Sequence, residues 1–119
     1  MARIIVVDDS KLMRHIVRHF LEEAGHEVEE WADVSAAEIQ GRLEAYAPDL
    51  LITDYQMPGC NGLTVARLAH KAKPELPIII LTASHDPAVE AALHKQEVRA
   101  ILHKPLKGEE LLEIVRPLL

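Results

Sequence analysis

The 119-residue sequence contains a single cysteine, Cys60, and only four aromatic residues. An intramolecular disulfide is therefore excluded, and a reducing compartment is expected. Because aromatic side chains are so few, the hydrophobic core must consist mostly of aliphatic residues. No apolar run is long enough to span a membrane, and the N-terminus has no signal-peptide pattern. We therefore expect a cytoplasmic protein that does not insert into membranes.

Positive charge is also scarce, with 13 Lys and Arg residues against 19 Asp and Glu residues and a formal net charge of −6. This balance argues against a nucleic-acid-binding surface and favours solubility. Cys60 lies in a Gly-Cys-Asn-Gly loop with no partner base marked nearby, so we interpret it as an incidental thiol. The length fits one domain over residues 1–119, and 49% hydrophobic residues can supply its core.

Strand and helix patterns alternate five times along the chain. Apolar residues from Met13 to Ala24 recur at helical spacing, with Ser10 as a candidate N-cap and Gly25 after the helix end. The expected strands are Arg3–Val7, Glu27–Trp31, Asp49–Thr53, Ile78–Thr82 and Val98–Leu102. The expected helices cover residues 11–24, residues 35–46 with Ser35 as cap, a segment ending near Ala72, a segment beginning at Asp86–Pro87, and residues 107–118.

This alternation predicts an α/β fold with a doubly wound, five-stranded parallel sheet and five helices on its two faces. A flavodoxin-like strand order, 2-1-3-4-5, would place the first and third strands side by side at the switch point. The second strand is less apolar than the others and is expected near an edge. We see no repeat or linker, and we expect any output domain to lie outside this sequence.

Charged residues follow three of the most apolar segments. Asp8 and Asp9 come after the first strand, Asp54 after the third, and Lys104 after the fifth. Because the carboxyl ends of parallel strands line one crevice, these groups and Thr82 are expected to converge. Three carboxylates in one crevice repel each other unless a cation lies between them. The pattern therefore suggests a hard metal ion, and the lysine suggests an anion beside it.

Each of these residues also has a simpler interpretation. Asp8 and Asp9 can cap the helix that follows, and Asp54 can begin a turn. Thr82 can be an ordinary strand end, and Lys104 with its proline a solvated turn.

The seven histidines are interpreted mainly as surface residues. His15 and His19 have the i, i+4 spacing of a helical zinc site, but the sequence marks no third ligand, which favours a solvated helix face. His103 precedes Lys104 and is the histidine expected to lie nearest to the site. The remaining histidines are His26, His70, His85 and His94.

Four segments in this order resemble the receiver domain of two-component response regulators: residues 6–10 (Val-Val-Asp-Asp-Ser), 54–62 (Asp-Tyr-Gln-Met-Pro-Gly-Cys-Asn-Gly), 81–83 (Leu-Thr-Ala) and 104–106 (Lys-Pro-Leu). The resemblance covers essentially the whole chain. It implies that Asp54 accepts a phosphoryl group from a phosphohistidine on a histidine kinase or a histidine phosphotransfer protein. The domain would catalyse its own phosphorylation and dephosphorylation without being a conventional turnover enzyme.

The resemblance also implies the metal ligands. Asp9, Asp54 and the backbone carbonyl of Gln56 would bind Mg²⁺, or Mn²⁺ in its place, and Asp8 would hold the ion through water. This set agrees with the preference of Mg²⁺ for oxygen ligands and retained waters.

Thr82 and Lys104 would contact the phosphoryl oxygens, and a cis peptide bond before Pro105 would fix the lysine. Gln56 and Ser84 flank the expected phosphoryl site and would tune its hydrolysis.

The sequence departs from the family pattern at a position linked to signal output. The position three residues before the lysine, often aromatic in the family, is Ile101. We expect residues 98–114 and the fourth helix to form the signalling face, and the first helix, with Met13, Arg14 and Ile16, to dock the kinase.

Dimerisation through the fourth and fifth helices is common among relatives. A free-standing regulator, a piece of a DNA-binding regulator and a receiver of a hybrid kinase all stay open, although residues 97–103 lack the pattern common in winged-helix regulators.

Three other functions fit the sequence less well. A haloacid-dehalogenase-like phosphatase uses an Asp-x-Asp pattern after its first strand, whereas Asp8 and Asp9 are adjacent here. A flavin-binding electron carrier would need a phosphate loop that these carboxylates would repel. A pseudo-receiver that only binds partners is disfavoured because every chemical position is filled.

Overall fold

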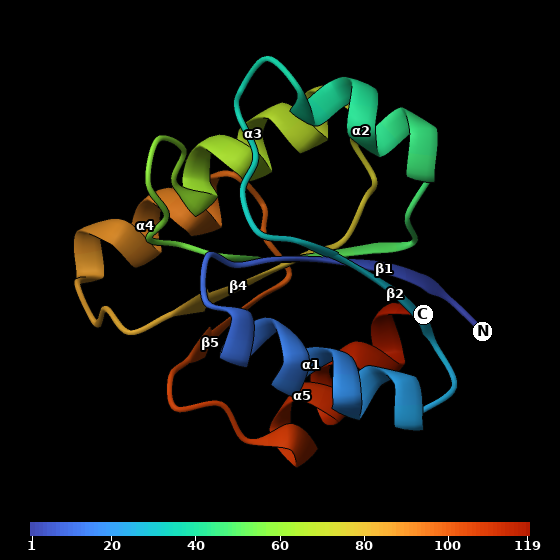
Figure 1. Ribbon diagram of the computed structural model, residues 1–119. Helices are drawn as coiled ribbons and strands as arrows, with labels where there is room; N and C mark the ends of the chain where they lie inside the picture. Colours follow the sequence, from blue (N-terminus) through green and yellow to red (C-terminus); the bar gives the residue numbers. More distant parts are fainter.

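The computed structural model describes all residues from 1 to 119 and contains a parallel sheet with helices on both faces (Figure 1). The strands are β1 (Arg3–Val7), β2 (Glu27–Trp31), β3 (Leu50–Asp54), β4 (Ile78–Thr82) and β5 (Ala100–His103). Their order is β2-β1-β3-β4-β5, with every neighbouring pair parallel. The predicted architecture and strand order are therefore confirmed, with β2 at one edge.

Five α-helices connect the strands. They are α1 (Lys11–Glu23), α2 (Ile39–Tyr46), α3 (Gly62–Ala72), α4 (Pro87–Lys95) and α5 (Gly108–Val115), followed by a 3₁₀ turn at Arg116–Leu118. Figure 1 shows α1 and α5 on one face of the sheet, and α2, α3 and α4 on the other. None of these helices is long and apolar enough to cross a lipid bilayer.

The core lies in two layers, one on each face of the sheet. Alternate residues of a strand point to opposite faces, so Ile4 and Val6 pack under α1 and α5, whereas Ile5 and Val7 pack under α2 and α3. Every residue of β3 and β4 is buried. Central strands covered on both faces must be apolar along their whole length, which explains their continuous Ile and Leu runs.

Most predicted helix ends are confirmed. The Ser10 side chain accepts a hydrogen bond from the backbone N–H of Met13 at 3.2 Å and caps α1. Gly25 has a φ of 94°, the left-handed conformation expected after the helix end. Asp86 caps α4 by accepting from the N–H of Ala88 at 2.9 Å.

The predicted start of the second helix is wrong. This helix begins at Ile39, and residues 36–38 form a turn. The hydroxyl of Ser35 donates to the carboxylate of Glu38 at 2.6 Å and makes no capping hydrogen bond. A side-chain partner three residues away thus removes the capping role that the sequence suggested.

Three other boundaries shift for local reasons. The strand β3 runs from Leu50 to Asp54, so it begins and ends one residue later than the predicted Asp49–Thr53. The strand β5 begins at Ala100, because the chain turns at Glu97, which has a φ of 63°. The helix α5 ends at Val115, where Pro117 supplies no N–H to continue it.

Candidate acidic functional site

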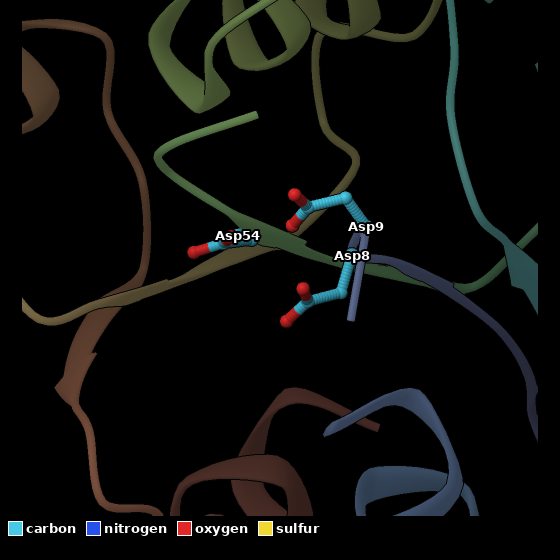
Figure 2. Close-up of side chains that lie close together, drawn as sticks. All are labelled: Asp8, Asp9 and Asp54. Atoms are coloured by element: carbon cyan, nitrogen blue, oxygen red, sulfur yellow. The ribbon is translucent and has the colours of Figure 1, made fainter. Parts of the chain in front are cut away.

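Three carboxylates meet at the carboxyl edge of the sheet. Asp8 and Asp9 follow β1, and Asp54 is the last residue of β3, whose Thr53 pairs with Val7. Carboxylate oxygens of the three residues lie within 4.8 Å of one another, and Figure 2 shows the three side chains extending to the same side. Asp8 is fully buried, Asp54 is 4% exposed and Asp9 is exposed. The predicted convergence of these carboxylates is confirmed.

Lys104 supplies the cation of this cluster. Its Nζ lies 3.1 Å from Oδ1 of Asp54 and 3.4 Å from Oδ2 of Asp8. The lysine follows β5 directly, and the Lys104–Pro105 peptide bond is cis, as expected. One ammonium group therefore contacts two of the three carboxylates, which leaves the cluster with excess negative charge.

The environment of Asp8 shows the effect of this excess. Burial raises the pKa of the Asp8 carboxyl most, and the negative charge of Asp54 raises it further. A hydrogen bond from the N–H of Ser10 and the charge of Lys104 oppose this rise without cancelling it. A donor set made only of oxygens, with unneutralised negative charge, suits a hard divalent cation such as Mg²⁺.

Thr82 is the last residue of β4, the strand next to β3 in the sheet. It is 1% exposed, and its neighbour Leu81 pairs with Asp54 in the sheet register. The Oγ1 atom of Thr82 accepts a hydrogen bond from the N–H of Ser84 at 2.9 Å. Gln56 is exposed in the loop two residues after Asp54.

Comparison with known proteins agrees with this arrangement. A family model described as the response regulator receiver domain matches residues 4–116. The chain belongs to this family. The receiver domain is 35% identical over 117 residues to the response regulator MprA of Mycobacterium avium, covering 98% of this chain and 50% of MprA. It is 32% identical over 110 residues to the cyclic di-GMP phosphodiesterase response regulator RpfG of Xanthomonas campestris, covering 91% of this chain and 29% of RpfG.

Solved structures give the same assignment. The chemotaxis protein CheY4 of Vibrio cholerae superimposes with a TM-score of 0.89 at 30% identity, covering 100% of this chain and 99% of CheY4. The receiver domain spans half or less of the length of MprA and RpfG.

Sequence reasoning missed the role of Arg14 in this receiver domain. Its Nη1 donates to the backbone carbonyl of Asp8 at 2.7 Å, and its Nε donates to Glu30 Oε1 at 3.2 Å. The N–H of Asp8 donates to the carbonyl of Trp31 at 3.1 Å. Asp8 is thus held to the end of β2 on both sides. Because Glu30 is 16 residues away in the sequence, no local motif could indicate this contact.

A glycine also fixes the loop after β3. A Cβ at Gly62 would lie 2.7 Å from the carbonyl oxygen of Asp54 and 2.9 Å from Cα of Tyr55. The N–H of Gly62 donates to the carbonyl of Tyr55 at 2.7 Å. The loop can therefore fold back against the end of β3 only with a glycine at this position.

The surface prediction holds for His15, His19, His85 and His94, which are exposed, whereas His26, His70 and His103 are partly buried. His15 and His19 are exposed on α1 and pair with Glu30 and Glu23, respectively, and neither belongs to a three-residue metal-binding cluster. His26 is partly buried and accepts a hydrogen bond from the N–H of Ala2. Desolvation by burial lowers the pKa of its imidazole.

Proposed function

We propose that this receiver domain accepts a phosphoryl group on Asp54 from a phosphohistidine of a histidine kinase or a histidine phosphotransfer protein. The observation that carries the proposal is the position of Asp54, which is held 3.1 Å from the Lys104 ammonium and within 4.8 Å of two other carboxylates. Membership of the receiver family supports the same partner class. We infer that residues 1–119 form the phosphoacceptor unit and that it works in the cytoplasm.

In the proposed reaction, a carboxylate oxygen of Asp54 attacks the phosphorus atom of the donor. An O–P bond forms and the P–N bond of the phosphohistidine breaks, so the imidazole leaves with the bonding electrons and takes up a proton. Phosphoryl transfer depends mainly on in-line positioning and charge neutralisation. The rigid end of β3 positions the nucleophile, and the Lys104 ammonium stabilises negative charge on the phosphoryl oxygens.

The acidic cluster would hold Mg²⁺, or Mn²⁺ in its place, through Asp9, Asp54 and the backbone carbonyl of Gln56, with Asp8 acting through water. The all-oxygen donor set and the raised pKa of Asp8 support this assignment. When bound, the ion would neutralise phosphoryl oxygens that Lys104 alone cannot balance.

The bound phosphoryl group would also act as the signal. It adds roughly two negative charges at the crevice. Thr82 would donate its hydroxyl to the phosphoryl group, and Lys104 would neutralise part of its charge with the ammonium group. We propose that their response changes the face formed by α4, β5 and α5, and that Gln56 and Ser84 tune the rate of hydrolysis.

Intact-protein mass spectrometry after incubation with acetyl phosphate tests the proposal. We expect a mass gain of one phosphoryl group that requires both Mg²⁺ and Asp54, so it should disappear with EDTA and in Asp54→Asn. The matched control is Asp33→Asn, which changes an exposed aspartate outside the cluster. No gain in conditions that label another receiver domain would contradict the proposal and favour a module that only binds partners.

A further inference from the structure

A partly buried carboxylate lies between β2 and α1. The side chain of Glu30, on β2, is only 14% exposed, and each of its oxygens accepts a hydrogen bond from an arginine of α1. Nε of Arg14 donates to Oε1 at 3.2 Å, and Nη1 of Arg18 donates to Oε2 at 3.0 Å. Arg18 is itself held by Glu22 at 3.0 Å. The carboxylate of Glu30 is therefore fixed in one orientation.

The charges of these groups keep Glu30 ionised. Burial alone would raise the pKa of its carboxyl, but the hydrogen bond from Arg18, the charge of His15 and the hydrogen bond from Arg14 together lower it. A charged carboxylate that is shielded from water makes strong hydrogen bonds to a guanidinium group. Glu30 is thus a firm anchor for the Arg14 side chain.

Arg14 extends this contact to the acidic site. Its Nη1 donates to the backbone carbonyl of Asp8 at 2.7 Å, and its side chain is only 12% exposed. That carbonyl belongs to the peptide unit that joins Asp8 to Asp9. Because a peptide unit is planar, a bond that fixes its carbonyl also fixes the backbone from which the Asp9 side chain leaves. Glu30 therefore reaches both carboxylates after β1 through one arginine.

We propose that Glu30 is a positioning residue for the divalent-cation site. It orients Arg14, and Arg14 holds the Asp8–Asp9 peptide so that both carboxylates stay within 4.8 Å of that of Asp54. The inference rests on the proposed function, because the ion is the one that the acidic cluster would hold. Glu30 is not a member of that cluster and acts only through Arg14.

Charge and position have opposite effects at Arg14. Because Arg14 is a cation near a site for a cation, an effect of its charge alone would make its loss strengthen Mg²⁺ binding. If Arg14 positions the Asp8–Asp9 peptide, its loss weakens binding, since the ion must then order the two carboxylates. Groups that hydrogen-bond to metal ligands typically contribute about 10–100-fold to affinity. Glu30 is one contact further from the ligands, so we expect an effect of about 3- to 10-fold.

Calorimetric titration of the full chain with Mg²⁺ tests this role. Glu30→Gln keeps the shape of the side chain but leaves one oxygen for two arginines, and Glu30→Asp keeps the charge but withdraws it from Arg14 by one methylene. The matched control is Glu29→Gln, which removes the same charge from the preceding residue of β2, whose carboxylate accepts from Nε1 of Trp31 at 2.8 Å. Arg14→Met, alone and combined with Glu30→Gln, completes the set.

Both Glu30 variants should weaken Mg²⁺ binding about 3- to 10-fold, whereas Glu29→Gln should change it by less than about twofold. Arg14→Met should also weaken binding, and adding Glu30→Gln to it should cause no further loss, because the path is already broken. In amide NMR spectra without the ion, the Asp9 peak should shift in the Glu30 variants and stay in place in Glu29→Gln.

Equal losses in the Glu29 and Glu30 variants, stronger binding in Arg14→Met, or losses that add in the double variant would each overturn the inference. If Glu30→Gln does not fold, Glu30→Asp decides the same question, because an effect of charge alone predicts no loss there. Absence of Mg²⁺ binding by the wild type would instead show that the proposed function itself is wrong.

Discussion

Replacing Asp8 with asparagine should stabilise the folded protein in the absence of divalent cations. Asp8 is fully buried, and its carboxylate lies within 4.8 Å of those of Asp9 and Asp54. Asparagine has nearly the same shape and can still accept the hydrogen bond that the N–H of Ser10 makes to this side chain at 2.9 Å. The substitution therefore removes a buried charge with little change in packing.

The size of the gain follows from the distances. At an effective dielectric constant near 20, two unit charges 4.8 Å apart repel by about 3 kcal/mol, and the Lys104–Asp8 pair at 3.4 Å attracts by about 5 kcal/mol. The repulsions from Asp54 and Asp9 roughly offset this attraction, so the cost of burying the carboxylate decides the sign. Because Asp9 is exposed, its share is smaller, and we expect a net gain of about 1–2 kcal/mol.

The pH dependence of the gain has a defined sign. The pKa of Asp8 is raised in the folded state, mainly by burial, so the folded protein holds a proton that the unfolded chain has released. Stability from this group is present below the ordinary pKa of 3.8 and is lost as the pH rises through the higher folded value. The advantage of Asp8→Asn should therefore grow over that window and be fully present at neutral pH.

Urea and thermal unfolding with EDTA and with millimolar Mg²⁺ measure both effects. Without the ion, the variant should melt several degrees higher, at roughly 4 °C per kcal/mol for a domain of this size. With the ion, the wild type should gain more stability than the variant, because the variant has lost one carboxylate of the site. A variant less stable than the wild type in EDTA, or an equal Mg²⁺ effect in both, would refute the reasoning. Asp33→Asn, on the surface, is the control.

Three further substitutions test the surroundings of the site. Gly62→Ala should destabilise the fold by about 1–3 kcal/mol and slow labelling by acetyl phosphate, since its Cβ would lie 2.7 Å from the carbonyl of Asp54. Gly108→Ala should destabilise by a similar amount without affecting labelling at a temperature where it is folded, because its Cβ would overlap the Phe20 ring; adding Phe20→Leu should restore part of the loss. Arg14→Lys, which keeps the charge but not the two-pronged contact, should weaken Mg²⁺ binding several-fold as measured by calorimetry, whereas unchanged binding would exclude a positioning role.

The sheet was predictable because its strands are fully buried. Continuously apolar segments such as Ile78–Thr82 are typical of central strands that helices cover on both faces of the sheet. The helices that connect these strands make them run parallel to one another. The convergence of Asp8, Asp9 and Asp54 then follows from topology alone, since strands that run the same way end at the same edge.

Contacts made by individual side chains were not predictable from the same patterns. Arg14 has a helical position that suggested a docking surface, and only the folded chain shows that it donates both to the Asp8 carbonyl and to Glu30, 16 residues away. Ser35 has the sequence signature of a cap, but its hydroxyl donates to Glu38 instead. The first contact depends on tertiary packing, and the second on a choice between two local partners.

The rigidity of the acidic site explains why its charge has to be met by a ligand. The backbone of Asp8 is held by Trp31 and Arg14, and its carboxylate by the N–H of Ser10 and by Lys104. Asp8 therefore cannot move away from Asp54 to relieve their repulsion, as flexible surface groups would. Binding a cation between these carboxylates lowers the free energy of the site without moving them. Because Lys104 directly follows β5 and contacts both Asp8 and Asp54, a change of charge in the cluster also changes the electrostatic interaction at the end of β5.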